Sequence, residues 1–205
     1  MSSLSSIANT APRVLFLARH GETAWNLEQR WQGQTDVDLN DAGRAQAAAL
    51  AARLAVHRIT RIIASDLSRA RETAEIIGRR LGVDGVLLDA GLRERGYGIF
   101  EGLTRTECEE QHPEEWARYV ADHRHTPARA EVDAAVVARM QAAIARAGAH
   151  AHSSGGAVLV VSHGGSIRAL IAAATGWRPP PMGNGDTYRV TMGADDLVRE
   201  PTLLP

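Results

Sequence analysis

Short apolar runs alternate with longer amphipathic stretches along most of the chain. The runs have the length of buried β-strands, and they occupy residues 13–18, 59–64, 83–88 and 157–161. The stretches that follow the first two runs carry helix boundary signals. Asn40 is a typical cap for a helix that reaches about Val56, and Gly82 is a typical stop for a helix from about Leu67 to Leu81.

Two further helices and a pair of strands are predicted in the second half of the chain. An alanine-rich helix covers about residues 132–152, and another covers about residues 166–174 before Gly176 stops it. Residues 187–192 and 197–200 have the composition of edge strands. Strands that alternate with helices predict an α/β fold, a three-layer αβα sandwich whose mostly parallel central sheet carries helices on both faces.

One segment breaks this alternation. Residues 103–130 are polar and helical in pattern, and Pro113 marks the start of a helix there. The 205 residues correspond to a little more than one typical domain. We therefore expect a single domain over residues 13–205 with a helical insertion at about 103–130, preceded by a Ser-rich, disordered terminus at residues 1–12.

Composition and charge exclude several classes of function. The formal net charge is −1, whereas nucleic-acid-binding proteins usually have a strong basic excess, so no nucleic-acid partner is expected. All 23 basic side chains are arginine, which excludes the lysine of a P-loop, a Schiff base or a pyridoxal phosphate site. The lone Cys108 permits no disulfide within the chain. Residues 1–12 lack the features of a signal peptide, and no apolar stretch could span a membrane, so we expect a cytoplasmic protein without a membrane partner.

Polar residues follow the predicted strands. Arg19 and His20 come directly after the first strand, and Arg69 lies shortly after the second. His163 follows the fourth strand. Ligands of α/β sheets bind beyond the carboxyl ends of the strands, so parallel strands would bring these side chains to one edge of the sheet. The guanidinium group of arginine matches phosphate oxygens with two parallel hydrogen bonds. A histidine among cations has a lowered pKa and therefore a free lone pair for attack. The sequence thus predicts a phosphate site with a nucleophilic histidine.

Cleavage of a phosphate ester also requires a proton donor for the leaving oxygen. Glu94 follows the third predicted strand and is the candidate, with Glu22 and Glu101 as competitors. The sequence offers no convincing set of metal ligands. Neither a metal nor another cofactor is therefore expected.

These residues belong to a series of sequence blocks that resembles the histidine phosphatase superfamily, and within it the phosphoglycerate mutase-like branch. The blocks occur in the family's order over about residues 13–192. They are Arg19-His20-Gly21-Glu22-Thr23 with Trp25-Asn26, Gln32 to Leu39, Asn40-Asp41-Ala42-Gly43, Ser65 to Ala70, Leu92 to Gly98, and Ser162-His163-Gly164-Gly165. A lone Arg-His-Gly is a weak signal, whereas the whole series is specific.

The resemblance implies phosphoryl transfer through a phosphohistidine intermediate, and it assigns roles to the site residues. His20 would be the nucleophile, and Glu94 would be the proton donor and then the base of the second step. The other catalytic residues, which bind the phosphoryl group, would be Arg19, Arg69 and His163. The residues that contact phosphate or substrate would be Thr23, Asn26, Gln32, Gly33, Tyr97, Arg105 and Gly164. The partner would be a small phosphorylated metabolite, bound by a monomer or a homodimer.

Departures from this branch bear on the reaction. The cofactor-dependent mutases carry two adjacent arginines that bind the second acid group of their substrate, and no such pair follows Arg105 in this sequence. They also have an asparagine where this chain has Gly165, which the phosphatase members share. Hydrolysis of a small phosphomonoester is therefore favoured, with phosphoglycerate mutase activity and an inactive phospho-ligand binding module as alternatives. Trp25 and Trp31 stack on the substrate in one interpretation and pack against the sheet in the other.

Overall fold

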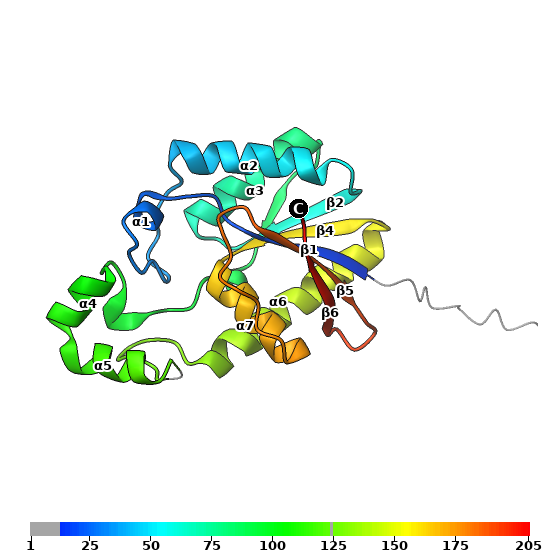
Figure 1. The fold of residues 1–205 in the computed structure, drawn as a ribbon. Helices are drawn as coiled ribbons and strands as arrows, with labels where there is room; N and C mark the ends of the chain where they lie inside the picture. The colour runs from blue at the N-terminus through cyan, green and yellow to red at the C-terminus, as the bar shows by residue number, and fades with distance from the viewer. Residues whose placement is uncertain (1–12, 124) are drawn as a thin grey trace, which may run out of the picture.

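The computed structural model describes residues 13–123 and 125–205 (Figure 1). The disordered terminus expected at residues 1–12 lies outside this part of the chain. Within the described residues, one six-stranded sheet has the order β3-β2-β4-β1-β5-β6. Its strands are β1 (Arg13–Arg19), β2 (Ile59–Ala64), β3 (Val86–Leu88), β4 (Ala157–Ser162), β5 (Thr187–Met192) and β6 (Val198–Leu203).

The strands on one side of the sheet are parallel. β1 pairs with β4, β4 with β2, and β2 with β3, all in the parallel sense. β5 and β6 continue the sheet beyond β1 in antiparallel pairs. Because β2, β4 and β1 are neighbours that run in the same direction, their carboxyl ends meet at one edge of the sheet.

Helices cover both faces of the sheet, which confirms the predicted three-layer α/β architecture (Figure 1). Leu50 of α2 and Phe16 of β1 belong to a core cluster on one face, together with residues of α3. Leu15 and Leu17 point to the other face, where they join Ile144 of α6 and residues of α7. No helix in the described part of the chain is long and apolar enough to cross a membrane. The α-helices are α1 (Ala24–Leu27), α2 (Asp41–Leu54), α3 (Ser68–Leu81), α4 (Arg105–Gln111), α5 (Pro113–Ala121), α6 (Asp133–Ser154) and α7 (Gly164–Thr175).

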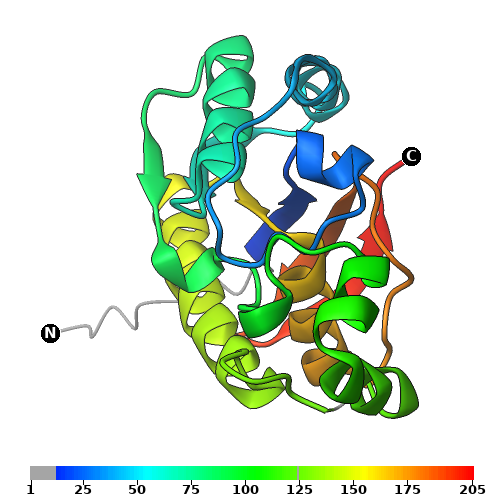
Figure 2. The same ribbon diagram turned by 90° about the vertical axis from the view of Figure 1, so that its left-hand side faces the viewer.

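The segment that breaks the alternation holds α4 and α5. Pro113 occupies the first turn of α5, as predicted. The ring centroids of Trp116 and Tyr119 in α5 lie 5.7 Å and 5.8 Å from that of Phe100, which is fully buried. Tyr119 also lies 5.7 Å from Trp31, measured between ring centroids. Figure 1 places α4 and α5 apart from the helices that cover the sheet, and in Figure 2, seen from this side, they lie in front of α7. The aromatic cluster fixes them to the loops around Trp31 and Phe100.

Several boundaries differ from the predictions for local reasons. β3 is shorter than expected because Gly82 and Gly85 adopt positive φ angles of 67° and 71° and turn the chain before Val86. The helix predicted from residue 166 already begins at Gly164. The prediction that residues 187–192 form an edge strand is wrong, because β5 lies between β1 and β6 and is paired on both sides.

Candidate active site

Two histidines lie side by side where β1 and β4 end. Arg19, the last residue of β1, is in register with Ser162, the last residue of β4. The next residue in each case is a histidine, and the His20 amide donates a hydrogen bond to the Ser162 carbonyl at 3.0 Å. The ring centroids of His20 and His163 are 5.1 Å apart. The parallel pairing of the two strands therefore brings together residues that are far apart in the sequence.

The imidazole of His20 is buried and uncharged. Only 4% of the residue is exposed. Burial lowers the pKa of His20 well below its ordinary value of 6.5, and the positive charges of Arg69 and Arg19 lower it further. Nδ1 lies 2.6 Å from the carbonyl oxygen of Gly21, and a carbonyl can only accept a hydrogen bond, so Nδ1 carries the proton. Nε2 therefore keeps an unprotonated lone pair.

The backbone around His20 is held from three directions. The Gly21 amide donates to Oγ1 of Thr73 at 3.0 Å, and the side-chain amide of Asn184 donates to the His20 carbonyl at 3.1 Å. A Cβ atom on Gly21 would overlap the backbone of Gly43 at the start of α2. Position 21 therefore requires glycine for close packing.

Arg69 brings a buried cation to the site from the first turn of α3. Its terminal nitrogens donate to the carbonyls of Thr35 at 2.9 Å and Gly33 at 2.8 Å. Burial lowers the pKa of Arg69 to about 10, so the guanidinium is still charged at neutral pH. Its Nε is buried and has no hydrogen-bond partner among the described residues. An unpaired donor of this kind is unusual in a protein interior and is what an anion-binding site provides.

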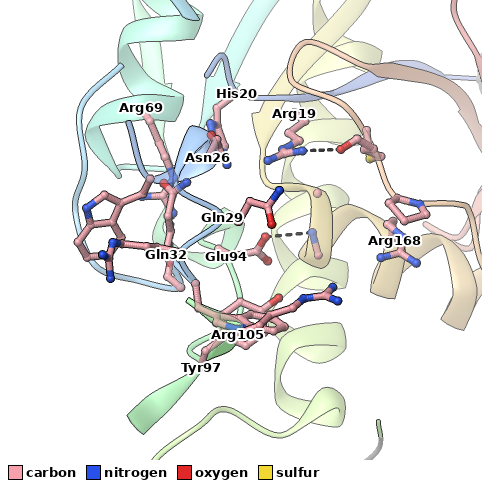
Figure 3. A pocket seen from close by; sticks show the side chains of 18 residues that line it. Arg19, His20, Asn26, Gln29, Gln32, Arg69, Glu94, Tyr97, Arg105 and Arg168 are labelled. Carbon is pink, nitrogen blue, oxygen red and sulfur yellow. Dashed lines mark hydrogen bonds between the residues drawn. The ribbon is translucent and has the colours of Figure 1, made fainter. Parts of the chain in front are cut away.

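His163 and Arg19 complete the surroundings of His20. His163 is fully buried, and neither of its ring nitrogens has a hydrogen-bond partner in the part of the chain that the structure describes. Burial lowers the pKa of His163, and the charge of Arg69 adds to this effect. The Arg19 guanidinium donates to the Met182 carbonyl. Figure 3 shows Arg19 and Arg69 on either side of His20, so an anion beside the imidazole would meet cations from two directions.

Glu94 occupies the N-terminus of α7. Its Oε2 accepts from the Gly165 amide at 2.9 Å, and its Oε1 accepts from the amide and the hydroxyl of Ser166, each at 2.9 Å. A Cβ atom on Gly165 would lie 2.7 Å from Oε1, so the carboxyl group reaches this position because residue 165 is glycine. The amides of Gly165 and Ser166 at the N-terminus of α7 are therefore bound by Glu94 and are not free for a ligand.

A cavity of about 730 Å³ opens beside His20 (Figure 3). His163 is not among the residues that line the cavity, although its ring centroid lies 5.1 Å from that of His20. Thr23 is fully buried, and its hydroxyl caps α1 by accepting from the Asn26 amide at 3.3 Å, so it supports Asn26 instead of lining the cavity. The other predicted site residues all line the cavity, namely Arg19, His20, Asn26, Gln32, Gly33, Arg69, Glu94, Tyr97, Arg105 and Gly164.

The two tryptophans of the sequence motifs also line the cavity. The Trp31 ring centroid lies 4.6 Å from that of Tyr97 and 5.7 Å from that of Tyr119 in α5. Trp31 therefore packs against neighbouring aromatic rings and still presents a surface to the cavity. Trp25 contributes to the same wall.

Sequence reasoning missed several lining residues, of which Arg168 matters most. It lies on α7 four residues after Gly164, and this spacing places both on the same side of a helix, which is a signal the sequence did contain. Asn184, which holds the His20 carbonyl, comes from the loop before β5 and carries no such signal. Gln29, Arg30, Pro181 and Met182 also line the cavity.

The acids that competed with Glu94 have other partners. Glu101 accepts hydrogen bonds from the amides of Tyr97 at 2.9 Å and Thr35 at 3.1 Å, so its carboxylate joins two loops of the site from outside the cavity. Glu22 accepts from the side-chain amide of Asn40 at 2.8 Å. Glu94 is thus the carboxylate that faces the cavity among the described lining residues.

The described residues offer neither a metal site nor a reactive thiol. No group of three or more His, Cys, Asp or Glu side chains is placed there to hold a metal ion. Burial raises the pKa of the Cys108 thiol to about 11, so it carries no thiolate at neutral pH. The arrangement around His20 is suited instead to binding an anion beside a neutral imidazole.

Comparisons with known proteins point to the same chemistry. The family model of the histidine phosphatase superfamily (branch 1) matches residues 15–193. Phosphoglycerate mutase-like protein 4 of Arabidopsis thaliana is 40% identical over 159 residues, which cover 76% of this chain and 68% of the relative. Glucosyl-3-phosphoglycerate phosphatase of Mycobacterium tuberculosis is 37% identical over 167 residues, which cover 78% of this chain and 74% of the relative.

Solved structures are similar over nearly the whole chain. A mycobacterial glucosyl-3-phosphoglycerate phosphatase in complex with VO3 has a TM-score of 0.81 at 33% sequence identity, and the match covers 93% of this chain and 97% of the phosphatase chain. The phosphoglycerate mutase from Bacillus anthracis str. Sterne has a TM-score of 0.80 at 25% sequence identity, and the match covers 95% of this chain and 94% of the mutase chain. The family match runs from β1 to the residue after β5, and so it includes both histidines, both arginines beside His20, and Glu94. The chain belongs to the histidine phosphatase superfamily.

Proposed function

We propose that this protein hydrolyses a small phosphate monoester through a phosphohistidine on His20. In the first step, Nε2 of His20 bonds to phosphorus while the bond from phosphorus to the ester oxygen breaks, and Glu94 gives a proton to the leaving alkoxide. In the second step, Glu94 takes a proton from water as the water oxygen bonds to phosphorus and the phosphorus–nitrogen bond breaks. The products are the alcohol and inorganic phosphate, and no metal or cofactor takes part.

The state of His20 is the observation that carries this proposal. A carbonyl fixes the proton on Nδ1, and burial beside Arg69 and Arg19 keeps the ring neutral, so Nε2 is ready to attack. The same arginines would stabilise the charge of the phosphoryl group in transfer. Each guanidinium about 4 Å from a unit negative charge contributes roughly 4 kcal/mol at an effective dielectric constant of about 20.

Hydrolysis is favoured over intramolecular transfer for two reasons. A mutase must hold the dephosphorylated acid while it turns, and the tandem arginine pair that grips this acid in the cofactor-dependent mutases has no counterpart after Arg105. Gly165 takes the place of their asparagine and packs against the Glu94 carboxyl group. The relative from Mycobacterium tuberculosis that is named as a phosphatase matches over 74% of its length, which supports the same choice.

The direct test is steady release of phosphate from p-nitrophenyl phosphate in the presence of EDTA. We expect turnover by the wild-type protein and a loss of at least ~10³-fold in His20→Ala, because the nucleophile and the covalent intermediate both disappear. His150→Ala, on α6 outside the cavity, is the matched control and should keep its activity. Full activity in His20→Ala would refute the mechanism.

The alternatives predict different outcomes. If 2-phosphoglycerate forms from 3-phosphoglycerate faster than phosphate is released, the protein is a mutase. If no ester in a broad screen is turned over while vanadate or phosphate still binds, the protein is an inactive phospho-ligand binding module. Arg105 lines the cavity, and a basic residue occupies the corresponding place in the cofactor-dependent mutases. This feature keeps the mutase alternative open.

A further inference from the structure

The arginines of the cavity form two groups with different partners. Arg19 and Arg69 lie beside His20 (Figure 3). Arg30 also lines the cavity, but it is neutralised by Glu28 at 2.6 Å and by Glu107 at 2.5 Å. That leaves two lining arginines, Arg105 and Arg168, which form no ion pair with any described residue.

Arg168 is a cation held in place without a counter-ion. Its Nε donates to the Pro179 carbonyl at 2.9 Å, which fixes the guanidinium, and its two terminal nitrogens make no hydrogen bond within the described residues. The residue is only partly exposed, and burial lowers its pKa, with Arg178 adding like charge. A positive charge in this setting is stabilised most by an anion from outside the chain.

Arg105 reaches the same cavity from another element. It is the first residue of α4, after the Thr104 cap, and its side chain has no hydrogen-bond partner among the described residues. Figure 3 shows both Arg105 and Arg168 away from His20, with Glu94 between His20 and Arg105 and with Arg19 between His20 and Arg168. The cavity therefore has a second cationic end.

The proposed reaction fixes what lies at this second end. His20 attacks phosphorus, and Glu94 gives its proton to the oxygen on the far side of the phosphoryl group. The rest of the leaving alcohol must then extend beyond Glu94, toward Arg105 and Arg168. A phosphate dianion beside His20 satisfies Arg19 and Arg69 but leaves these two cations unmatched.

We propose that the alcohol part of the substrate carries a second anionic group, a carboxylate or a second phosphate, which Arg168 and Arg105 bind. This inference rests on the proposed hydrolysis. It names the substrate class, a small phosphate ester with a negative charge on the leaving alcohol. The subsite is built from α7 and the start of α4 and uses no tandem arginine pair.

Three esters with the same three-carbon skeleton provide the test. 3-Phosphoglycerate carries a carboxylate where glycerol 1-phosphate carries a neutral hydroxymethyl group, and 1,3-propanediol bisphosphate carries a second phosphate. We expect wild-type kcat/KM to be ~10- to 100-fold higher for the charged esters than for glycerol 1-phosphate, the size of one charge-assisted contact. The better charged ester identifies the second group.

Substitution of Arg168 separates recognition from a structural role. Arg168→Met should remove most of the ~10- to 100-fold preference, because kcat/KM should fall much further for the charged esters than for glycerol 1-phosphate. Arg105→Met should remove part of it. The control Arg178→Met deletes a neighbouring arginine that does not line the cavity, so it should leave the preference within ~3-fold of wild type. An equal loss on charged and neutral esters in Arg168→Met would show that the residue only supports the fold.

A binding measurement keeps this inference distinct from the proposed reaction. In His20→Ala, 3-phosphoglycerate should bind ~10-fold more tightly than glycerol 1-phosphate in calorimetry, and Arg168→Met in that background should abolish the difference. Equal binding of the two esters overturns the second subsite even if the wild-type protein hydrolyses p-nitrophenyl phosphate. Selective binding without any hydrolysis overturns the proposed reaction and leaves the subsite standing.

Discussion

Gly165→Ala is the sharpest probe of how Glu94 is placed. A Cβ atom at this position would lie 2.7 Å from Oε1 and 3.0 Å from Oε2 of Glu94, well short of the ~3.5 Å at which non-bonded atoms attract best. The carboxyl group must therefore move by several tenths of an ångström. The hydrogen bonds that it accepts from the Gly165 and Ser166 amides, both 2.9 Å long, cannot both survive this movement. A hydrogen bond contributes about 0.5–1.5 kcal/mol net, so the carboxyl group loses part of what holds it in place.

The cost to the reaction depends on the leaving group. Protonation of a poor leaving group by a positioned acid contributes ~10²–10⁴-fold, so kcat/KM for an alkyl phosphate should fall by ~10²-fold in Gly165→Ala. Nitrophenolate leaves without a proton, so kcat/KM for p-nitrophenyl phosphate should fall by less than ~5-fold. Parallel kcat/KM measurements with the two esters give the ratio directly.

Gly96→Ala is the matched control for this experiment. Gly96 lies two residues after Glu94, and a Cβ atom there would meet its nearest neighbour at 3.7 Å, an ordinary contact. The variant should keep both rates near those of the wild-type protein. If Gly165→Ala lowers the rates for the two esters equally, or changes neither, then Glu94 does not protonate the leaving group from this position.

Three other predictions test separate parts of the structure. His20 and His163 have lowered pKa values in the folded protein, so below pH 6.5 the unfolded chain binds more protons than the folded one. As the pH is lowered, the free energy of unfolding should therefore fall by up to ~1.4 kcal/mol per pH unit per histidine. Urea titrations at several pH values should show a shallower pH dependence of this free energy in His163→Asn. Arg139 donates hydrogen bonds to the carbonyls of Arg93 and Glu94 and so helps to position Glu94. Arg139→Met should lower kcat/KM ~10-fold for alkyl phosphates and less for p-nitrophenyl phosphate, and equal losses would contradict this positioning role. Phe100→Ala should cost about 3–5 kcal/mol of unfolding free energy in urea, against less than ~0.5 kcal/mol for the exposed Val120→Ala.

The sequence predicted the positions of several side chains where the sheet geometry alone decides them. His20 and His163 each follow a buried apolar run, and two such runs that pair in parallel must end at the same edge. Arg69 follows a third neighbouring strand, so the same argument places it. Ten of the predicted site residues accordingly line one cavity.

Contacts that depend on side-chain direction escaped prediction. Thr23 belongs to the leading motif, but its hydroxyl turns inward to cap α1, which a motif does not reveal. Nothing in the sequence indicates that the Glu94 carboxyl group binds the amides at the N-terminus of α7. Arg168 was overlooked although its spacing of four residues from Gly164 places both on the same side of α7. β5 was assigned to an edge because nothing in its own residues records that β6 pairs beside it.

Both steps of the proposed hydrolysis depend on a covalent bond between His20 and phosphorus. The most direct measurement is acid-free rapid quenching of the wild-type protein with p-nitrophenyl phosphate within the first turnover, followed by mass spectrometry of the peptide that contains His20. We expect a phosphate on His20 that is stable in alkali, labile in acid and absent from His20→Ala. A phosphate on another residue, or turnover at the full rate without any label on His20, would contradict it.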